Sequence, residues 1–148
     1  IQDWGGVHSS EILVLKKEKI TASIAQKMNL KINDIIFHSL IVHKDRGIPV
    51  QYSERFINPK VAPEYLNQDF KKITPSDYLL KKSPIQQAEH IIEAVNCNKQ
   101  IQKLLKIKSS EPCISLKRRT WSFDMVATYS IIISPGSRYK LVGKFMRG

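Results

Sequence analysis

The sequence lacks the features by which several large protein classes are recognised. No apolar run in its 148 residues approaches the length of a membrane-spanning helix, and no signal peptide is visible at its start. A Gly-rich phosphate loop and a nucleophile elbow are also missing. These absences argue against a membrane protein, a P-loop nucleotide-binding enzyme and an α/β-hydrolase.

Cysteine is scarce, and its placement gives no support to a metal site. Cys97 and Cys113 form no CxxC pair and have no histidine at zinc spacing. We expect two free thiols in a reducing compartment, with a disulfide as an open alternative. The four histidines also lack metal spacing. We therefore expect no catalytic set, no metal and no cofactor.

The composition is otherwise that of an ordinary globular protein. Hydrophobic residues make up 42% and charged residues 25%, and the length fits one domain with its own core. The first residue is Ile, so we expect a piece of a longer protein. The net charge is +11, and residues 99–148 contribute most of it. This basic third is a candidate nucleic-acid contact, but scattered solvated lysines are the favoured explanation, because no long basic helix or basic run with interleaved aromatic residues is present.

Hydrophobic periodicity predicts short helices set among longer strands. The expected strands are 9–15, 35–43, 48–57, 117–121 and 125–133. The expected helices are 22–28, 74–82 and 99–107. The apolar spacing of 85–95 also indicates a helix. Because short turns at 44–47 and 122–124 join successive strands, we expect an α+β fold with an antiparallel sheet flanked by helices.

Polar side chains in the last hairpin need an explanation. Alternation along a strand places Thr128, Ser130 and Ser134 on one face, and it places Arg118 and Arg119 on opposite faces. Small hydroxyls in an otherwise apolar strand indicate that they are paired or that they line a cavity. At most one of the two arginines is expected to face such a cavity.

Several stretches resemble one known family. They are HSLIVH (38–43), GIPVQYSERFINPKVAPEYLNQDF (47–70), TPSDYL (74–79), AEHIIEAV (88–95), EPCISLKRRTWS (111–122) and SPGSRYKLVGKF (134–145). Together they resemble the effector-binding domain of histidine-utilisation repressors, the HutC-like members of the GntR family of bacterial transcription regulators. One departure is Ser53, where members of this family often carry an acid.

The resemblance implies a UTRA-type domain with a fold like that of chorismate lyase. It implies that 1–33 holds the N-terminal segment with the first strand and helix, and that 34–148 holds the rest of one such domain. It implies a strand at 86–96, against the helical periodicity there. Family members act as homodimers and contact DNA through an N-terminal winged helix-turn-helix domain, which this sequence lacks. No membrane partner is implied, and the expected effector is urocanate.

Urocanate is a flat acid with a carboxylate at one end and an imidazole at the other. Its pocket needs an anion site, partners for the ring nitrogens and apolar or aromatic walls. The helix start at Thr74 and Ser76 is one candidate anion site, and similar helix starts receive the anionic group in relatives that bind sugar phosphates. Arg55 and either Arg118 or Arg119 are others. The competing explanations are plain helix capping and structural ion pairs.

The other end of the ligand has separate candidates. Acids and histidines offer partners for the imidazole: Glu54, Glu89, His43 and His90. Tyrosines offer walls: Tyr78, Tyr129 and Tyr139. A lone histidine or a strand tyrosine is also commonly structural. The predicted ligand-binding set is His43, Glu54, Arg55, Thr74, Ser76, Tyr78, His90, Arg119, Thr128, Ser134 and Tyr139.

The leading functional hypothesis is a sensing domain, not an enzyme, that binds urocanate or a similar imidazole acid between the sheet and the helix at 74–80 and thereby controls operator binding. The alternatives are a lyase-like enzyme acting on a small aromatic acid, a GntR-type sensor for another metabolite, and a basic nucleic-acid-binding module.

Overall fold

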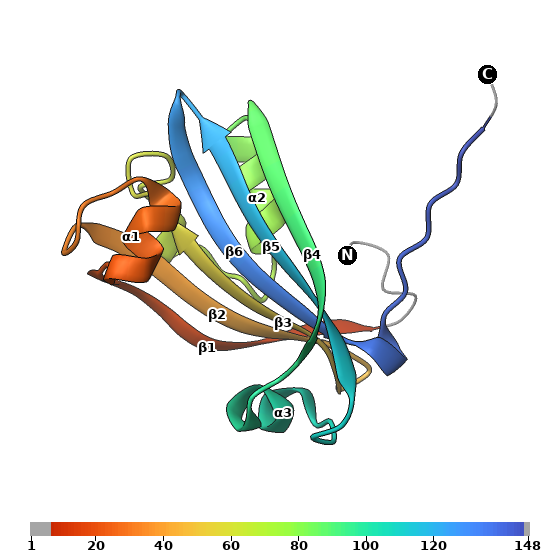
Figure 1. Ribbon diagram of the computed structural model, residues 1–148. Helices are drawn as coiled ribbons and strands as arrows, with labels where there is room; N and C mark the ends of the chain where they lie inside the picture. The colour runs from red at the N-terminus through yellow and green to blue at the C-terminus, as the bar shows by residue number, and fades with distance from the viewer. Residues whose placement is uncertain (1–6, 147–148) are drawn as a thin grey trace.

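The computed structural model describes residues 7–146, which form one antiparallel sheet with helices on both faces (Figure 1). The strands of these residues are β1 (His8–Lys19), β2 (Ile35–Asp45), β3 (Ile48–Ile57), β4 (Gln87–Asn96), β5 (Pro112–Ser122) and β6 (Met125–Pro135). The helices are α1 (Ala22–Met28), α2 (Pro75–Lys82) and α3 (Lys99–Leu105), with 3-10 turns η1 (Tyr65–Asn67) and η2 (Gly136–Arg138). The α+β fold class predicted from the sequence is confirmed.

The strand order is β1-β2-β3-β6-β5-β4, and every neighbouring pair is antiparallel. Two tight turns produce the hairpins β2–β3 and β5–β6. Arg46 and Gly47 have φ of 51° and 79°, and Phe123 and Asp124 have φ of 52° and 60°. Two consecutive residues at positive φ suit the right-handed twist of the strands that they join. β3 and β6, one strand from each hairpin, pair with each other at the centre of the sheet.

The segment with helical periodicity is an edge strand. β4 pairs along its whole length with β5, so the strand implied by the resemblance is confirmed and the helix indicated by periodicity is wrong. Almost every β4 side chain is exposed, including those of Ile91 and Ile92. The helical spacing of the apolar residues was misleading, because in the structure these side chains are exposed and form no buried stripe.

Strand alternation divides the core between the two faces of the sheet. One face, which we call the α2 face, carries Phe37, Ile41 and Ile57 and is covered by the chain between β3 and β4. Tyr65, Phe70, Tyr78 and Leu79 of this covering segment pack against those strand residues.

The opposite face is covered at two places. Ala25 and Met28 of α1 pack on Phe56 and Tyr129, and Leu105 of α3 packs on Tyr52 and its neighbours. Figure 1 shows α2 behind β5 and α1 and α3 near opposite ends of the sheet. On the α2 face, the part of the sheet formed by β6, β5 and β4 contributes no residue to these core clusters.

Local contacts set the ends of the helices. The Thr74 hydroxyl accepts a hydrogen bond from Asp77 N–H at 3.1 Å, and Pro75 occupies the first helical position of α2. Cys97 and Cys113, beside α3, are free thiols whose sulfurs lie 3.1 Å apart. Among residues 7–146, no helix has the length and apolarity needed to cross a lipid bilayer.

Candidate functional site

A cavity of about 420 Å³ lies between α2 and the α2 face of the sheet. Ser76 and Leu80 contribute from α2, and Tyr139 and Leu141 contribute from the extended segment after η2. Figure 1 shows this segment as an extended chain beyond β4. The volume suits a small metabolite.

The strand register gives the cavity a cationic row. Arg55 of β3 lies opposite Ser130 of β6, which lies opposite Arg118 of β5, which lies opposite His90 of β4. Because neighbouring strands are roughly 4.8 Å apart, the backbones of the two arginines are about 10 Å apart. Antiparallel pairing alone therefore brings two guanidinium groups and an imidazole to one line across the sheet.

The next positions along the strands are different in character. Two residues further, on the same face, the row is apolar: Ile132, Leu116 and Ile92 line the cavity. Two residues further again, Ser134 lies opposite Ile114, and Gln51 of β3 also lines the cavity. The cavity floor thus runs from cationic through apolar to neutral polar.

Arg55 is a buried cation held by neutral partners. Its side chain is 3% exposed and donates to Ser76 Oγ at 3.1 Å and Ser130 Oγ at 3.4 Å. No carboxylate among residues 7–146 forms an ion pair with it, and its Nε has no hydrogen-bond partner there. Burial lowers the pKa of Arg55, an electrostatic interaction with Tyr65 opposes this, and the nearby Arg118 lowers it further. A buried guanidinium with only neutral partners is a candidate for pairing with an anion.

Arg118 repeats the pattern on β5. It is half-buried at the cavity, and its Nε also has no hydrogen-bond partner within the described chain. Burial lowers the pKa of Arg118, and no carboxylate contributes to the shift. Buried charges in proteins are normally paired, so two guanidinium groups without a carboxylate partner in one cavity form a candidate anion-binding site.

The remaining polar floor contains further unpaired atoms. Gln51 Oε1 and Ser53 Oγ are buried and have no hydrogen-bond partner in the described residues. Together with Arg55 they form a line of alternate residues on β3, all on the α2 face. Buried polar atoms are nearly always satisfied, so such a line indicates partners that come from outside the chain.

Six residues of the predicted set lie at or next to the cavity. Five of them line it: Arg55, Ser76, His90, Ser134 and Tyr139. Thr128 lines a narrow extension of about 40 Å³ beside Ser130, where it shares a 2.7 Å hydrogen bond with Thr120.

Three predicted residues have structural positions instead. Thr74 caps α2. Tyr78 is buried against Tyr65 and Phe70, with ring centroids 6.2 and 6.3 Å away. His43 is fully buried beside His8, and burial, Arg55 and His8 lower the pKa of His43 to about 3. None of the three lines the cavity.

Two residues of the predicted set, Glu54 and Arg119, lie on the face of the sheet opposite the cavity because of strand alternation. Glu54 immediately precedes Arg55 on β3, so its side chain points to the opposite face of the sheet. Arg119 likewise points away from the cavity, where it donates to Glu89 at 3.0 Å and stacks on Trp121. At most one of the two adjacent arginines was expected to face a cavity, and of the two it is Arg118 that lines this one.

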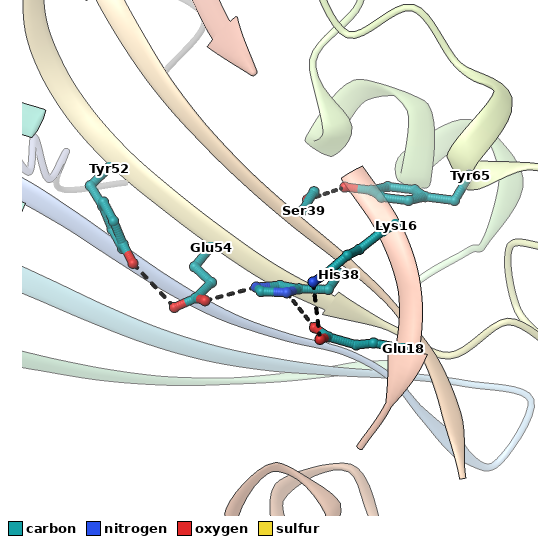
Figure 2. Close-up of polar contacts among 7 residues, drawn as sticks. All are labelled: Lys16, Glu18, His38, Ser39, Tyr52, Glu54 and Tyr65. Atoms are coloured by element: carbon teal, nitrogen blue, oxygen red, sulfur yellow. Dashed lines mark hydrogen bonds and ion pairs between the residues drawn. The ribbon is translucent and has the colours of Figure 1, made fainter. Parts of the chain in front are cut away.

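Glu54 belongs to a polar network on the opposite face, shown in Figure 2. Tyr52 donates to Glu54 at 3.2 Å, and His38 contacts Glu54 at 2.7 Å and Glu18 through its other ring nitrogen. His38 also stacks on Phe56 at 4.5 Å. Burial lowers the pKa of His38, but the hydrogen bonds and charges of Glu54 and Glu18 outweigh it, and the net shift is upward. This network joins β1, β2 and β3 through the side chains of Glu18, His38 and Glu54.

Two residues that line the cavity, Gln51 and Arg118, were not in the predicted set, which contained Arg119 instead of Arg118. A signal for Gln51 was present, because residues 51, 53 and 55 are polar at alternate positions of one strand. No sequence signal distinguishes Arg118 from Arg119, because alternation separates them without saying which face α2 covers.

Comparison with known proteins gives a consistent result. A family model described as the UTRA domain matches residues 4–140. The histidine utilization repressor of Pseudomonas putida is 38% identical over 143 residues, which cover 97% of this chain and 58% of that protein. The chain therefore spans a little over half the length of this curated relative.

Solved structures agree. The C-terminal domain of the histidine utilization repressor from Pseudomonas syringae pv. tomato is 41% identical, with a TM-score of 0.92 and coverage of 95% of this chain and 100% of that chain. The effector domain of PhnF from Mycobacterium smegmatis, 11% identical, has a TM-score of 0.84 and coverage of 99% and 91%, which shows a shared fold. The similarity to repressors confirms the prediction of a regulatory domain rather than an enzyme.

Proposed function

The chain belongs to the UTRA domain family, in which it is similar to the histidine utilization repressors, and we propose that it senses urocanate for such a repressor. One observation carries the choice of an acid as the ligand. Arg55 and Arg118 lie in the same cavity without a carboxylate partner among the described residues.

The order of the cavity floor supports this particular acid. The carboxylate of urocanate pairs with Arg55 and Arg118, because guanidinium groups donate two parallel hydrogen bonds to a carboxylate. Its flat unsaturated chain lies over the apolar row, which includes Leu116 and Ile132. Its imidazole reaches the neutral polar end beside Ser134 and Tyr139. Each part of the ligand then meets a matching part of the protein.

The elements that line the cavity give a ligand a route to control DNA binding. Ser76 and Leu80 of α2 and Tyr139 of the C-terminal segment line it together with the sheet, so a ligand there contacts three separate parts of the chain. A ligand shifts a conformational equilibrium only by binding one state more tightly. We propose that urocanate favours the closed arrangement of these parts, that the repressor is a homodimer in the bacterial cytoplasm, and that closure repositions DNA-binding domains outside this chain.

Calorimetric titration of urocanate into a matched pair of variants tests the site. Arg118→Met and Arg119→Met are the same substitution at adjacent positions that face opposite sides of the sheet. Removing one partner of a buried charge pair costs about 2 kcal/mol or more, which corresponds to roughly thirtyfold in Kd. We expect this loss for Arg118→Met and unchanged binding for Arg119→Met. Equal effects of the two substitutions would show that the anion binds elsewhere.

The same pair of arginines also favours one alternative effector. Two guanidinium groups without an acid suit the double charge of a phosphate as well as a carboxylate. Titration with a sugar phosphate separates the two ligands. If the sugar phosphate binds and urocanate does not, the chain is a sensor for a phosphorylated metabolite.

A further inference from the structure

We infer that Gln51 recognises the ring end of the effector by accepting a hydrogen bond from a ring N–H. This inference rests on the proposed function, and it adds the residue that selects a nitrogen heterocycle over other flat acids. It begins from one atom, the amide oxygen of Gln51, which is buried and has no hydrogen-bond partner in the described chain.

The position of Gln51 relative to the anion site supports the assignment. Gln51 and Arg55 lie on the same face of β3, four residues apart, which places their backbones roughly 13 Å from each other. Both side chains line the cavity, and the apolar side chains of Ile132 and Leu116 lie along its floor. A small acid held by Arg55 therefore has its opposite end directed along the cavity toward Gln51.

The chemistry of the Gln51 environment favours a donor from the ligand. The side chain is 6% exposed, so bulk water has little access to it. A buried amide oxygen without a partner costs free energy that a ligand N–H recovers on binding. Sites built to satisfy a hydrogen-bonding ligand reject analogues that lack the group, because the protein atom is then left unpaired.

The anion site at Arg55 and the acceptor of Gln51 together define the class of ligand. It is a flat unsaturated acid whose ring carries an N–H, such as an imidazole acid, in preference to acids with a phenyl or furan ring. The neighbouring Ser134 hydroxyl lines the same end of the cavity and is available to the second ring nitrogen.

Calorimetry with two ligands and two variants tests the inference. Urocanate and 3-(2-furyl)acrylate share the acrylate and a five-membered ring, but only urocanate carries an N–H. We expect the unmodified chain to bind urocanate at least tenfold more tightly. Gln51→Met removes the acceptor and keeps the length, so we expect it to lose about tenfold for urocanate and to bind both acids alike. Gln51→Glu keeps an oxygen acceptor, and we expect it to retain the preference for urocanate.

The outcomes separate this inference from the proposed function. If Arg118→Met abolishes urocanate binding and Gln51→Met leaves it unchanged, the effector assignment stands and the role of Gln51 is overturned. If the unmodified chain binds the two acids equally, the role of Gln51 is overturned whether or not the variants fold. If it binds neither acid at millimolar concentration, the proposed effector and the role of Gln51 both fall.

Discussion

Replacing Arg55 by methionine is expected to stabilise the protein while destroying its response to the effector. Arg55 is 3% exposed and carries its charge among neutral partners. The effective cost of burying an unpaired ion is several kcal/mol, and Arg118 nearby increases it through repulsion. Methionine fills a similar volume without charge and suits irregular cavities.

The gain is reduced by the hydrogen bonds that Arg55 makes. The bond to Ser76 at 3.1 Å has ordinary geometry, and the bond to Ser130 at 3.4 Å is longer than usual, so the two together are worth about 2–3 kcal/mol. A net stabilisation of about 1–3 kcal/mol remains. At about 2–4 °C per kcal/mol for a domain of this size, we expect Tm to rise by roughly 2–12 °C.

Thermal unfolding with and without urocanate measures both effects. We expect Arg55→Met to unfold at higher temperature than the unmodified protein, and we expect urocanate to raise the Tm of the unmodified protein and of Arg119→Met but not that of Arg55→Met. Arg119→Met is the control, because Arg119 contacts Glu89 and Trp121 at the protein surface, where solvent weakens such pairs. A fall in Tm for Arg55→Met as large as that of a core truncation would refute the reasoning, because it would mean that Arg55 has a structural counter-charge.

The remaining predictions concern the scaffold. Thr74→Ala removes the cap of α2, and we expect a loss of about 1 kcal/mol in denaturant unfolding; an unchanged midpoint would contradict the capping role. Phe70→Ala truncates a fully buried ring and should cost about 3–5 kcal/mol, whereas a cost below 1 kcal/mol would contradict the packing described for the α2 face. Because the pKa of His38 is raised in the folded protein, the stabilisation by protonated His38 is fully present below pH 6.5 and is lost as pH rises through the raised pKa. The free energy of unfolding should therefore fall with pH across this range, and this dependence should disappear in His38→Gln. An NMR titration should find His43 neutral down to about pH 4, since its pKa is about 3; titration near pH 6.5 would contradict its burial beside Arg55.

Much of the fold could be predicted because the local signals agree with the tertiary structure. The turn at Arg46-Gly47, the cap and proline at Thr74-Pro75 and the β-branched run of β6 each determine their own conformation. The exception is β4, an edge strand with exposed side chains, for which no buried face exists to impose a period of two.

The site was less predictable because alternation gives relative and not absolute directions. It separates Arg118 from Arg119 and Glu54 from Arg55, but only the position of α2 decides which member of each pair reaches the cavity. Residue type was also misleading. Glu54 offers the more obvious partner for an imidazole, whereas the neutral Gln51 lies at the cavity and Glu54 is already paired with His38.

A crystal structure of the chain with bound urocanate tests the central claim most directly. The account predicts the carboxylate within hydrogen-bond distance of the guanidinium groups of Arg55 and Arg118, with the imidazole at the end of the cavity formed by Gln51 and Ser134. Urocanate bound on the opposite face beside His38, or in the cavity with its carboxylate away from both arginines, would contradict it.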